Sequence, residues 1–335
     1  KKEFNDDIRE YLQKNSNPNL QRAVIIIPIV FHIVWRTAAE NISDSCIISQ
    51  MEALNRDFRK LSTDILNAPA HIQALAVDCE LNFCFATKDP QGNPTNGIVR
   101  KQTTKTSFDP LTGTVAFAAN GGDDTWGSDK YLNIWVCNMG TSIAGYVTAV
   151  GCAADSDKDG IFLNYLITGQ GKCCWKERFN RGRTAVHEVG HWLGLEHTFQ
   201  GGCVGTDIST CNTEGDMVCD TPPTANSNFS NAECTPQNTC TETPNDETDM
   251  VENYMDYTGE KCHVIFTPGQ KARMIATYNQ CRQSIGNGAS ANCSTVGIDK
   301  LNLNNIISVF PNPTDGNIFV NFGIFDLGKV DIKVY

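Results

Sequence analysis

The sequence predicts an α/β fold of the α+β kind, with a sheet-bearing first part and an irregular second part. Three observations support this prediction. Apolar segments typical of strands and helices alternate through the first 195 residues. A histidine-rich helix ends that part of the chain at Gly194. After Gly194 the chain is rich in Cys, Asn and Thr without sustained periodicity, which indicates a loop-rich region.

The strands are predicted from apolar, β-branched segments. Ala23–Trp35 is apolar and rich in β-branched residues, but it is too short to span a bilayer and is interrupted by Pro28 and His32. We therefore interpret it as a buried strand. Further strands are predicted at Cys79–Thr87, Tyr131–Cys137 and Ser142–Thr148.

The helices follow from apolar residues at helical spacing. Ser43–Lys60 is predicted to be helical, with Ser43 at its start. The histidine-rich helix covers Thr184–Leu195, with Thr184 as its N-cap. A closing helix is expected at Thr267–Arg282, with Pro268 in its first turn. The polar segment Lys1–Gln21, which precedes the first strand, has only a weak helical pattern at Asp6–Lys14.

The composition excludes some classes of protein. A formal net charge of -11 argues against binding to nucleic acid or to anionic membranes. Fifteen cysteines favour an oxidising, extracellular setting, and their odd number leaves at least one thiol without a partner in this chain. No signal peptide is visible and the sequence starts without Met, so we expect a processed or trimmed chain.

The histidine-rich helix carries the pattern H-E-x-x-H-x-x-G-x-x-H. His187 and His191 are four residues apart and share one helix face, so both imidazoles can bind one zinc ion. Gly194 permits a turn that brings His197 to the metal as a third ligand. Glu188 is placed to activate a zinc-bound water. Three protein ligands and an open position predict a catalytic rather than a structural zinc site.

A second motif, Asn253-Tyr254-Met255-Asp256-Tyr257, lies downstream of the cysteine-rich stretch. The long histidine motif followed by a methionine turn is the metzincin signature. Met255 is expected to pack under the zinc site as an apolar floor. Tyr257 can bring a phenol near the metal to stabilise an oxyanion, the alternative being a buried structural tyrosine.

These motifs resemble the pappalysin family of metzincin zinc metallopeptidases, in its bacterial cytophagalysin branch. The resemblance rests on the segment HEVGHWLGLEHTF, the G-D-M-V-C-D-T-P-P segment, the methionine turn and Phe266-Thr267-Pro268-Gly269-Gln270. It covers roughly Ala23 to Arg282 and implies a twisted, mostly parallel five-stranded sheet in an upper subdomain (23–197) over an irregular, disulfide-rich lower subdomain (198–285). It also implies that residues 1–22 are a propeptide remnant or an N-terminal extension.

The resemblance assigns further roles to individual residues. Ala144, Gly145 and Tyr146 would form a rim strand above the cleft, where an exposed edge can bind an extended peptide. The family pattern suggests disulfides Cys203–Cys234 and Cys240–Cys262, with Cys211–Cys219 as an extra short loop.

Two acidic segments are candidate cation sites. Asp216, Asp220 and Thr221 match a calcium-binding loop of the family, the alternative being a turn held by Asx hydrogen bonds. Asp155–Gly160 resembles the start of a calcium loop, but Leu166 stands where the distal Glu is expected, so we interpret it as a solvated acidic turn.

The last segment changes character. Residues 286–305 are small and polar and indicate a linker. Residues 306–322 are predicted as strand, turn and strand, with Pro311-Asn312-Pro313-Thr314-Asp315-Gly316 between the strands. With this P-N-P-T-x-G segment, residues 306–335 resemble the start of a type IX secretion sorting domain, the alternative being a generic β-hairpin. This resemblance implies secretion, either into the medium or to the cell surface.

We therefore expect a secreted, monomeric zinc endopeptidase with protein or peptide substrates, zinc as its cofactor, and calcium as a second metal. An inactive zinc-containing surface adhesin is the main alternative, although it would have no chemical need for Glu188. A zinc amidase is a second alternative, and a structural zinc module is disfavoured because no fourth protein ligand is apparent in the sequence.

Overall fold

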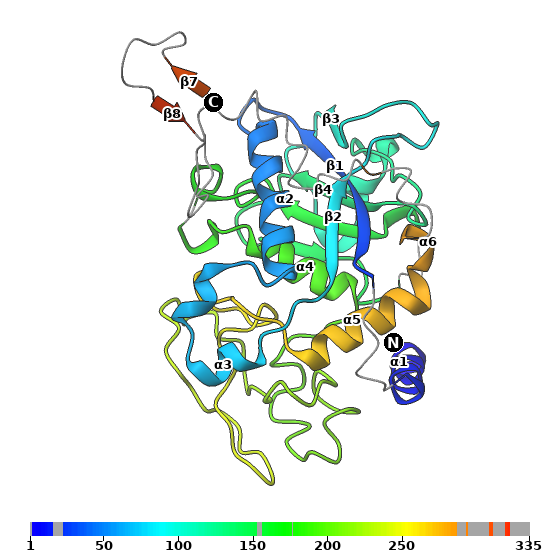
Figure 1. The fold of residues 1–335 in the computed structure, drawn as a ribbon. Coiled ribbons are helices and arrows are strands. Elements are labelled where there is room, and N and C mark those ends of the chain that lie inside the picture. The colour runs from blue at the N-terminus through cyan, green and yellow to red at the C-terminus, as the bar shows by residue number, and fades with distance from the viewer. Residues whose placement is uncertain are drawn as a thin grey trace, which may run out of the picture. The chain divides into compact units, whose positions relative to one another are not determined.

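The centre of the fold is β1 (Ile25–Trp35), which lies in a six-stranded sheet of order β2-β1-β4-β6-β5, with β3 also paired to β1 (Figure 1). β2 (Leu81–Phe85) pairs with the first half of β1 and β3 (Ile98–Gln102) with its second half. The other strands are β4 (Leu132–Cys137), β5 (Gly145–Val147) and β6 (Gly160–Asn164). All pairings are parallel except that of β5 with β6.

This sheet confirms the predicted fold class, with one strand more than expected. The segments predicted as strands form β1, β2, β4 and β5, each shorter than or within the predicted range. β3 and β6 were not predicted. β6 is fully buried, whereas β3 is half-polar and partly exposed. Short strands of either kind show little alternation of apolar and polar residues, so the sequence pattern does not reveal them.

The computed structural model describes residues 2–15, 23–152, 156–175, 177–286, 293, 308–310 and 319–321. Residues Lys1–Cys293 form one compact unit and Ser294–Tyr335 a second. In the second unit β7 (Ser308–Phe310) pairs antiparallel with β8 (Phe319–Asn321), as predicted for this segment. Almost all of the predicted linker lies outside the described residues. No helix in the described part of the chain is long and apolar enough to cross a membrane.

Helices α2 (Asp44–Phe58) and α4 (Arg183–Trp192) pack on one face of the sheet. They bury apolar side chains against Ile27, Phe31 and Ile134. The remaining helices are α1 (Lys2–Lys14), α3 (Ala70–Leu75), α5 (Pro268–Cys281) and α6 (Gln283–Gly286). Short 3-10 turns occupy Thr63–Asn67, Pro110–Thr112, Thr114–Ala116, Ala118–Asn120, Ser156–Lys158, Gly171–Cys173 and Glu177–Phe179.

The opposite face of the sheet is covered by the loop that contains Phe108. Alternate residues of β1 point to opposite faces, so Val34 faces away from the helices. It packs with Trp135, Phe162 and Phe108 in a second apolar cluster. Both faces of the central strands are therefore buried, as is usual for parallel sheets.

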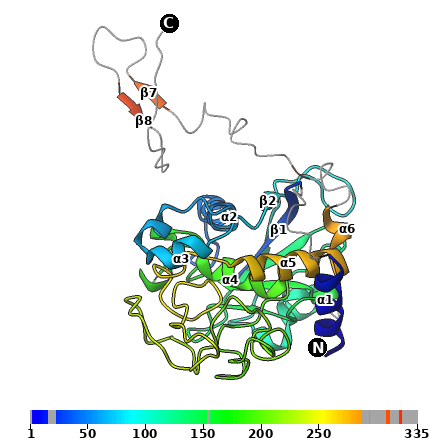
Figure 2. The ribbon, with the colours of Figure 1, turned by 60° about the horizontal axis from the view of Figure 1, so that its bottom comes forward.

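Two predicted helix starts can be compared with the structure. α5 begins at Pro268, one residue after the predicted start, and Thr267 and Gln270 form a capping box there. α4, however, begins at Arg183 with Gly182 as its N-cap, so the prediction of Thr184 as the cap was wrong. The weak helical pattern near the N-terminus is a regular helix, α1, which lies alongside α5 (Figure 2).

Candidate metal and active site

Three imidazoles converge at the end of α4. His187, His191 and His197 offer ring nitrogens that all lie within 4.8 Å of one another. The Nε2 atom of His197 is 2.9 Å from that of His191 and 3.2 Å from that of His187. Ligands at a zinc–nitrogen distance of about 2.0–2.1 Å in a tetrahedral site would be separated by about 3.3 Å. The spacing therefore fits one zinc ion.

The backbone sets the tautomers of two of these histidines. His187 Nδ1 lies 2.7 Å from the carbonyl oxygen of Tyr254, and His191 Nδ1 lies 2.7 Å from that of Leu195. A carbonyl only accepts, so each Nδ1 carries the hydrogen and each Nε2 presents a lone pair. The Nε2 lone pairs of His187 and His191 are therefore both directed to the position that His197 Nε2 approaches, where a shared cation would be bound. Burial also lowers the pKa of His187 well below its usual value, which keeps it in the neutral form that binds metals.

Gly194 makes the turn that brings His197 to the site. Its φ is +88°, in the left-handed region that favours glycine. Its N–H donates to the carbonyl of His191 at 2.8 Å, and its own carbonyl accepts from Arg273 Nε at 2.7 Å. Thr277 Oγ1 would lie 2.3 Å from an added Cβ. The turn therefore requires glycine for both its backbone angle and the space around it.

Met255 forms a floor against the metal helix. It is fully buried, and its sulfur would lie 2.6 Å from a Cβ built on Gly190. Gly190 lies between His187 and His191 in the sequence, so the thioether packs on the backbone of α4 beside these two histidines. The predicted position of Met255 beneath the histidines agrees with this packing.

Glu188 lies on the cleft side of α4, under the edge strand. Its side chain is buried, and its Oε1 would lie 2.6 Å from a Cβ on Gly145 of β5. Burial raises the pKa of its carboxyl to about 8. The positive charge of a nearby zinc ion would act in the opposite direction. The small size of Gly145 thus allows strand β5 to lie directly over this carboxylate.

Tyr257 stands across the site from Glu188 and is 39% exposed. Its ring centroid is 4.7 Å from that of His197 and 5.4 Å from that of His187. Burial, and then the charge of Glu188, raise the pKa of its phenol to about 12. The phenol therefore remains a hydrogen-bond donor at neutral pH, next to His187 and His197.

Glu260 connects the Tyr257 segment to the start of α4, a role that was not predicted from the sequence. Its carboxylate accepts from the Thr184 N–H at 2.7 Å, the Thr184 hydroxyl at 2.8 Å and the Arg181 N–H at 2.7 Å. It thereby performs the capping role predicted for Thr184, because a carboxylate at a helix N-terminus satisfies free N–H groups and the helix dipole. A contact between positions 76 residues apart leaves no local signal in the sequence.

The acidic segment Asp216–Thr221 is a hydrogen-bonded turn at the base of α5. Asp216 is buried and accepts from the Val218 N–H and the Thr221 hydroxyl. Asp220 accepts from the Thr267 hydroxyl at 2.6 Å and the Gly269 N–H at 2.7 Å. Asp220 thus caps α5. Burial raises the pKa of Asp216 to about 7, so a cation at its side would relieve an unfavourable buried charge.

The second acidic turn has a structural role. Asp159 is buried and pairs with Arg282, whose Nη1 lies 2.6 Å from Asp159 Oδ2, and Oδ1 accepts from Trp192 Nε1 at 3.0 Å. The expectation of a solvated turn was wrong at this residue, and Asp155 lies outside the described residues. Both carboxylate oxygens of Asp159 are already used in tying α4 to the end of α5.

The disulfide predictions were correct for one pair and wrong for two. Cys211–Cys219 is present as expected. The predicted Cys203–Cys234 and Cys240–Cys262 are replaced by Cys203–Cys240 and Cys234–Cys262. Pairing depends on which Cα atoms approach to about 5.5 Å in the fold, and spacing in the sequence does not encode that distance. The described residues also contain the pairs Cys46–Cys173, Cys84–Cys293 and Cys152–Cys281.

Comparison with known proteins shows which family the chain belongs to. A family model described as pregnancy-associated plasma protein-A, peptidase family M43, matches residues 119–279. An extracellular metalloprotease of Verticillium alfalfae is 30% identical over 272 residues, 78% of each chain. The chain therefore belongs to the pappalysin family of metallopeptidases. Another extracellular metalloprotease, from Pyricularia oryzae, is 48% identical over 105 residues, which are 31% of this chain and 33% of that protein.

Two solved structures are similar over most of the chain. A Tannerella forsythia promirolysin mutant matches with a TM-score of 0.74 and 32% identity, covering 87% of this chain and 92% of that one. Mature mirolysin from the same organism, in complex with a cleaved peptide, matches with a TM-score of 0.72 and 35% identity, covering 82% and 99%. The sheet, the helices and the irregular region therefore follow an established peptidase fold.

Proposed function

We propose that the protein is a secreted zinc endopeptidase, in which His187, His191 and His197 hold the metal and Glu188 is the general base. One observation carries the proposal: three Nε2 atoms converge beside a buried carboxylate at the edge of a cleft. Family membership supports it, as do the names of the relatives, which are extracellular metalloproteases. Peptide or protein substrates follow from the same relationship.

The chemistry is divided between the metal and the side chains around it. When bound, zinc supplies a Lewis acid that acidifies water and polarises the substrate carbonyl. Glu188 accepts the proton of the attacking water and delivers it to the leaving amine. The phenol of Tyr257 donates a hydrogen bond to the oxyanion of the tetrahedral intermediate, consistent with its raised pKa.

The substrate backbone is proposed to bind along β5. Ala144, Gly145 and Tyr146 line the cleft, and β5 stands at one end of the strand order, paired with β6 alone. An extended peptide can add to such an edge through main-chain hydrogen bonds. Gly145 then sets the peptide close to Glu188.

Calcium at the Asp216–Thr221 turn is a further part of the proposal. Asp216, Asp220 and Thr221 supply two carboxylates and a hydroxyl, the oxygen ligands that calcium prefers, and without the ion all three are hydrogen-bonded to neighbouring groups. The expected effect is on stability, because the turn lies at the base of α5.

Other assignments also remain proposals. These are membership of the cytophagalysin branch, a monomeric state, the domain bounds 1–22, 23–285 (upper 23–197, lower 198–285), 286–305 and 306–335, and a sorting role for the last segment in type IX secretion. The β7–β8 pairing is compatible with a small C-terminal β module.

The test is cleavage of a denatured, peptide-rich substrate by the native protein and by Glu188→Ala, with fragments read by mass spectrometry. We expect fragments from the native protein and none from the variant when both contain zinc. Glu233→Ala, which alters an exposed carboxylate, serves as a control and should cleave normally. Cleavage by Glu188→Ala at the native rate would contradict the proposal. No cleavage by either zinc-loaded protein would favour the adhesin alternative.

A further inference from the structure

The third proposed metal ligand, His197, lies beyond the end of α4. His187 and His191 are on the helix, so helix geometry places both of their side chains. His197 follows the turn 193–196, which is neither helix nor strand, so its position depends on the contacts that the turn makes. The N–H of Leu195 donates to the Gly190 carbonyl at 3.0 Å, and the Leu195 carbonyl accepts from His191. These contacts tie one side of the turn to α4.

The other side of the turn is held from α5 by Arg273. Its Nε donates to the Gly194 carbonyl at 2.7 Å, and its Nη2 donates to Asn5 Oδ1 at 2.6 Å. Arg273 is 3% exposed, and the carboxylates of Glu196 and Asp216 supply negative charge that attracts its guanidinium. A charged donor forms a stronger hydrogen bond to a carbonyl than a neutral donor does. Arg273 is therefore a firm connection between α5 and the turn.

Helix α1 contacts the same backbone through Phe4. The ring of Phe4 lies against two glycines, since a Cβ added at Gly151 or Gly194 would lie 2.3 Å or 3.1 Å from its Cζ. The N–H groups of these glycines both donate to the His191 carbonyl, at 2.9 Å and 2.8 Å. Phe4 and Asn5 therefore reach the backbone that joins α4 to the turn.

α1 is anchored along its length and lies beside α5 (Figure 2). Ile8 is fully buried, and Asn279 Nδ2 donates to the Tyr11 hydroxyl at 2.8 Å. Among the described residues, none that lines the cleft beside Glu188 belongs to α1. The side chains of α1 can therefore be changed without replacing a residue of the cleft.

We propose that Arg273 is a positioning residue for His197, and that α1 holds the Arg273 guanidinium in place through Asn5. The inference rests on the proposed function only in that the three histidines hold zinc. With both contacts made, the turn presents His197 before the metal arrives. Without them the turn has more conformations to lose when the metal binds, which weakens binding. Replacing such a supporting group typically lowers metal affinity by about 10–100-fold.

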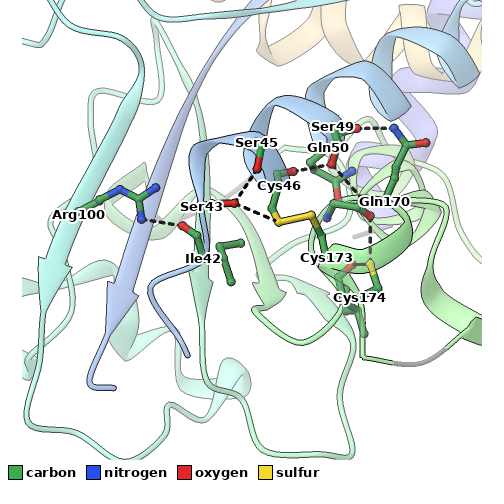
Figure 3. The surroundings of a disulfide bond; sticks show 12 residues. Ile42, Ser43, Ser45, Cys46, Ser49, Gln50, Arg100, Gln170, Cys173 and Cys174 are labelled. Carbon is green, nitrogen blue, oxygen red and sulfur yellow. Dashed lines mark hydrogen bonds between the residues drawn. A yellow bond between two sulfur atoms is a disulfide. The ribbon is translucent and has the colours of Figure 1, made fainter. Parts of the chain in front are cut away.

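The start of α4 provides a matched comparison. Gln50 on α2 is fully buried, and its Nε2 donates to the carbonyl of Gly182, the N-cap of α4, at 2.8 Å. Figure 3 shows Gln50 on α2 close to the Cys46–Cys173 disulfide. Like Arg273, it is a buried polar side chain that binds a backbone carbonyl at one end of α4, but at the end away from the turn. Loss of Gln50 should therefore lower stability without displacing the third histidine.

The experiment measures the zinc affinity of the full chain by competition with a chelator of known affinity. We expect Arg273→Gln to weaken zinc binding by about 10–100-fold, because glutamine is too short to keep both hydrogen bonds. Arg273→Lys keeps a charged donor and should recover part of this loss. Asn5→Ala removes only the support of the guanidinium and should weaken zinc binding by a smaller factor of about 3–10.

A spectroscopic readout separates positioning from general stability. Cobalt(II) is bound in place of zinc, because its visible absorption depends on the number and geometry of its ligands. We expect altered visible bands in Arg273→Gln and native bands in two controls, Gln50→Met and Tyr11→Phe. Thermal unfolding of the metal-free proteins should show that Gln50→Met is folded but less stable. Tyr11→Phe removes an α1–α5 hydrogen bond away from the turn and should keep the native zinc affinity.

Three results would overturn the inference. The first is native zinc affinity with native cobalt bands in folded Arg273→Gln. The second is native zinc affinity in Asn5→Ala, which decides even if no Arg273 variant folds. The third is an equal loss of zinc affinity in Gln50→Met and Arg273→Gln, because general destabilisation would then explain both. If the native protein itself binds no zinc, the proposed function fails instead.

Discussion

The two walls of the cleft are stabilised by different means. Residues 25–197 form the rigid region, which has a six-stranded sheet and a continuous apolar core. The histidine-bearing helix α4 packs on this core. Residues 198–267 form the cross-linked region, which has no regular strand or helix among its described residues. Three disulfides lie within it. Figure 1 shows α4 between these two regions. All three proposed metal ligands thus come from the rigid region, whereas Met255 and Tyr257 come from the cross-linked one.

This difference shows how a segment without regular secondary structure can hold the side chains of the cleft in defined positions. Chain without a large apolar core gains stability from cross-links, which limit the freedom of the unfolded state. A few contacts with the rigid region fix its position, namely Met255 on Gly190, Glu260 on Thr184 and Arg178 on the Tyr257 carbonyl. Each prediction below perturbs one region or one of these contacts.

The largest effect is expected in the rigid region, at Glu188. Glu188→Gln removes the proton acceptor but keeps the side-chain size, so kcat should fall by about 10³-fold. Zinc content and melting temperature should stay close to native. Steady-state kinetics with one fluorogenic peptide measure the loss, and a decrease of less than tenfold would mean that another group accepts the proton.

The next effect is expected in the cross-linked region. Replacing Cys234 and Cys262 by Ser removes the disulfide beside His263 and should lower the free energy of unfolding by about 2–4 kcal/mol. Limited proteolysis should then cut first within residues 198–265. The matched change at Cys46 and Cys173 should leave that segment resistant, because that pair lies in the rigid region. Equal susceptibility in both variants would contradict the comparison.

A smaller effect should follow from changing the contact between Gly190 of the rigid region and Met255 of the cross-linked region. Gly190→Ala places a Cβ 2.6 Å from Met255 Sδ, so overpacking should cost about 1–3 kcal/mol and reduce activity. Met255→Ala alone should also destabilise. The double variant should lose less than the sum of the single changes, because each change relieves the other. Additive losses in thermal unfolding would mean that the two side chains do not share this contact.

The smallest effect is expected at Asp216. Its pKa of about 7 lies above the value of about 3.9 for an unfolded Asp. In calcium-free protein the native state therefore holds this proton more tightly, and the stabilisation is complete below about pH 4 and disappears as pH rises through about 7. Calcium should raise the melting temperature at pH 8 by a few degrees, and Asp216→Asn should abolish this increase. A calcium response that persists in Asp216→Asn would place the cation elsewhere.

The sequence predicted the rigid region better than the cross-linked one. The strands β1, β2 and β4 and the helix α5 follow from local apolar patterns and capping residues, and the metal motif follows from fixed spacing on one helix. The disulfide partners of Cys203 and Cys234 were predicted wrongly because they depend on distances in the folded chain. Glu260 was missed for the same reason, since it acts on Thr184, 76 positions away. Gly145 was predicted as a residue of the rim strand, but its close approach to Glu188 was not.

The central claim is that α4 and its turn hold one zinc ion by three histidines and leave a position open toward the cleft. Anomalous diffraction at the zinc edge, from crystals of the zinc-loaded protein, tests it most directly. We expect one peak at about 2.0–2.1 Å from the Nε2 atoms of His187, His191 and His197, with no fourth protein ligand. A peak that lies elsewhere, or one with a fourth protein ligand, would contradict the account of this site as catalytic.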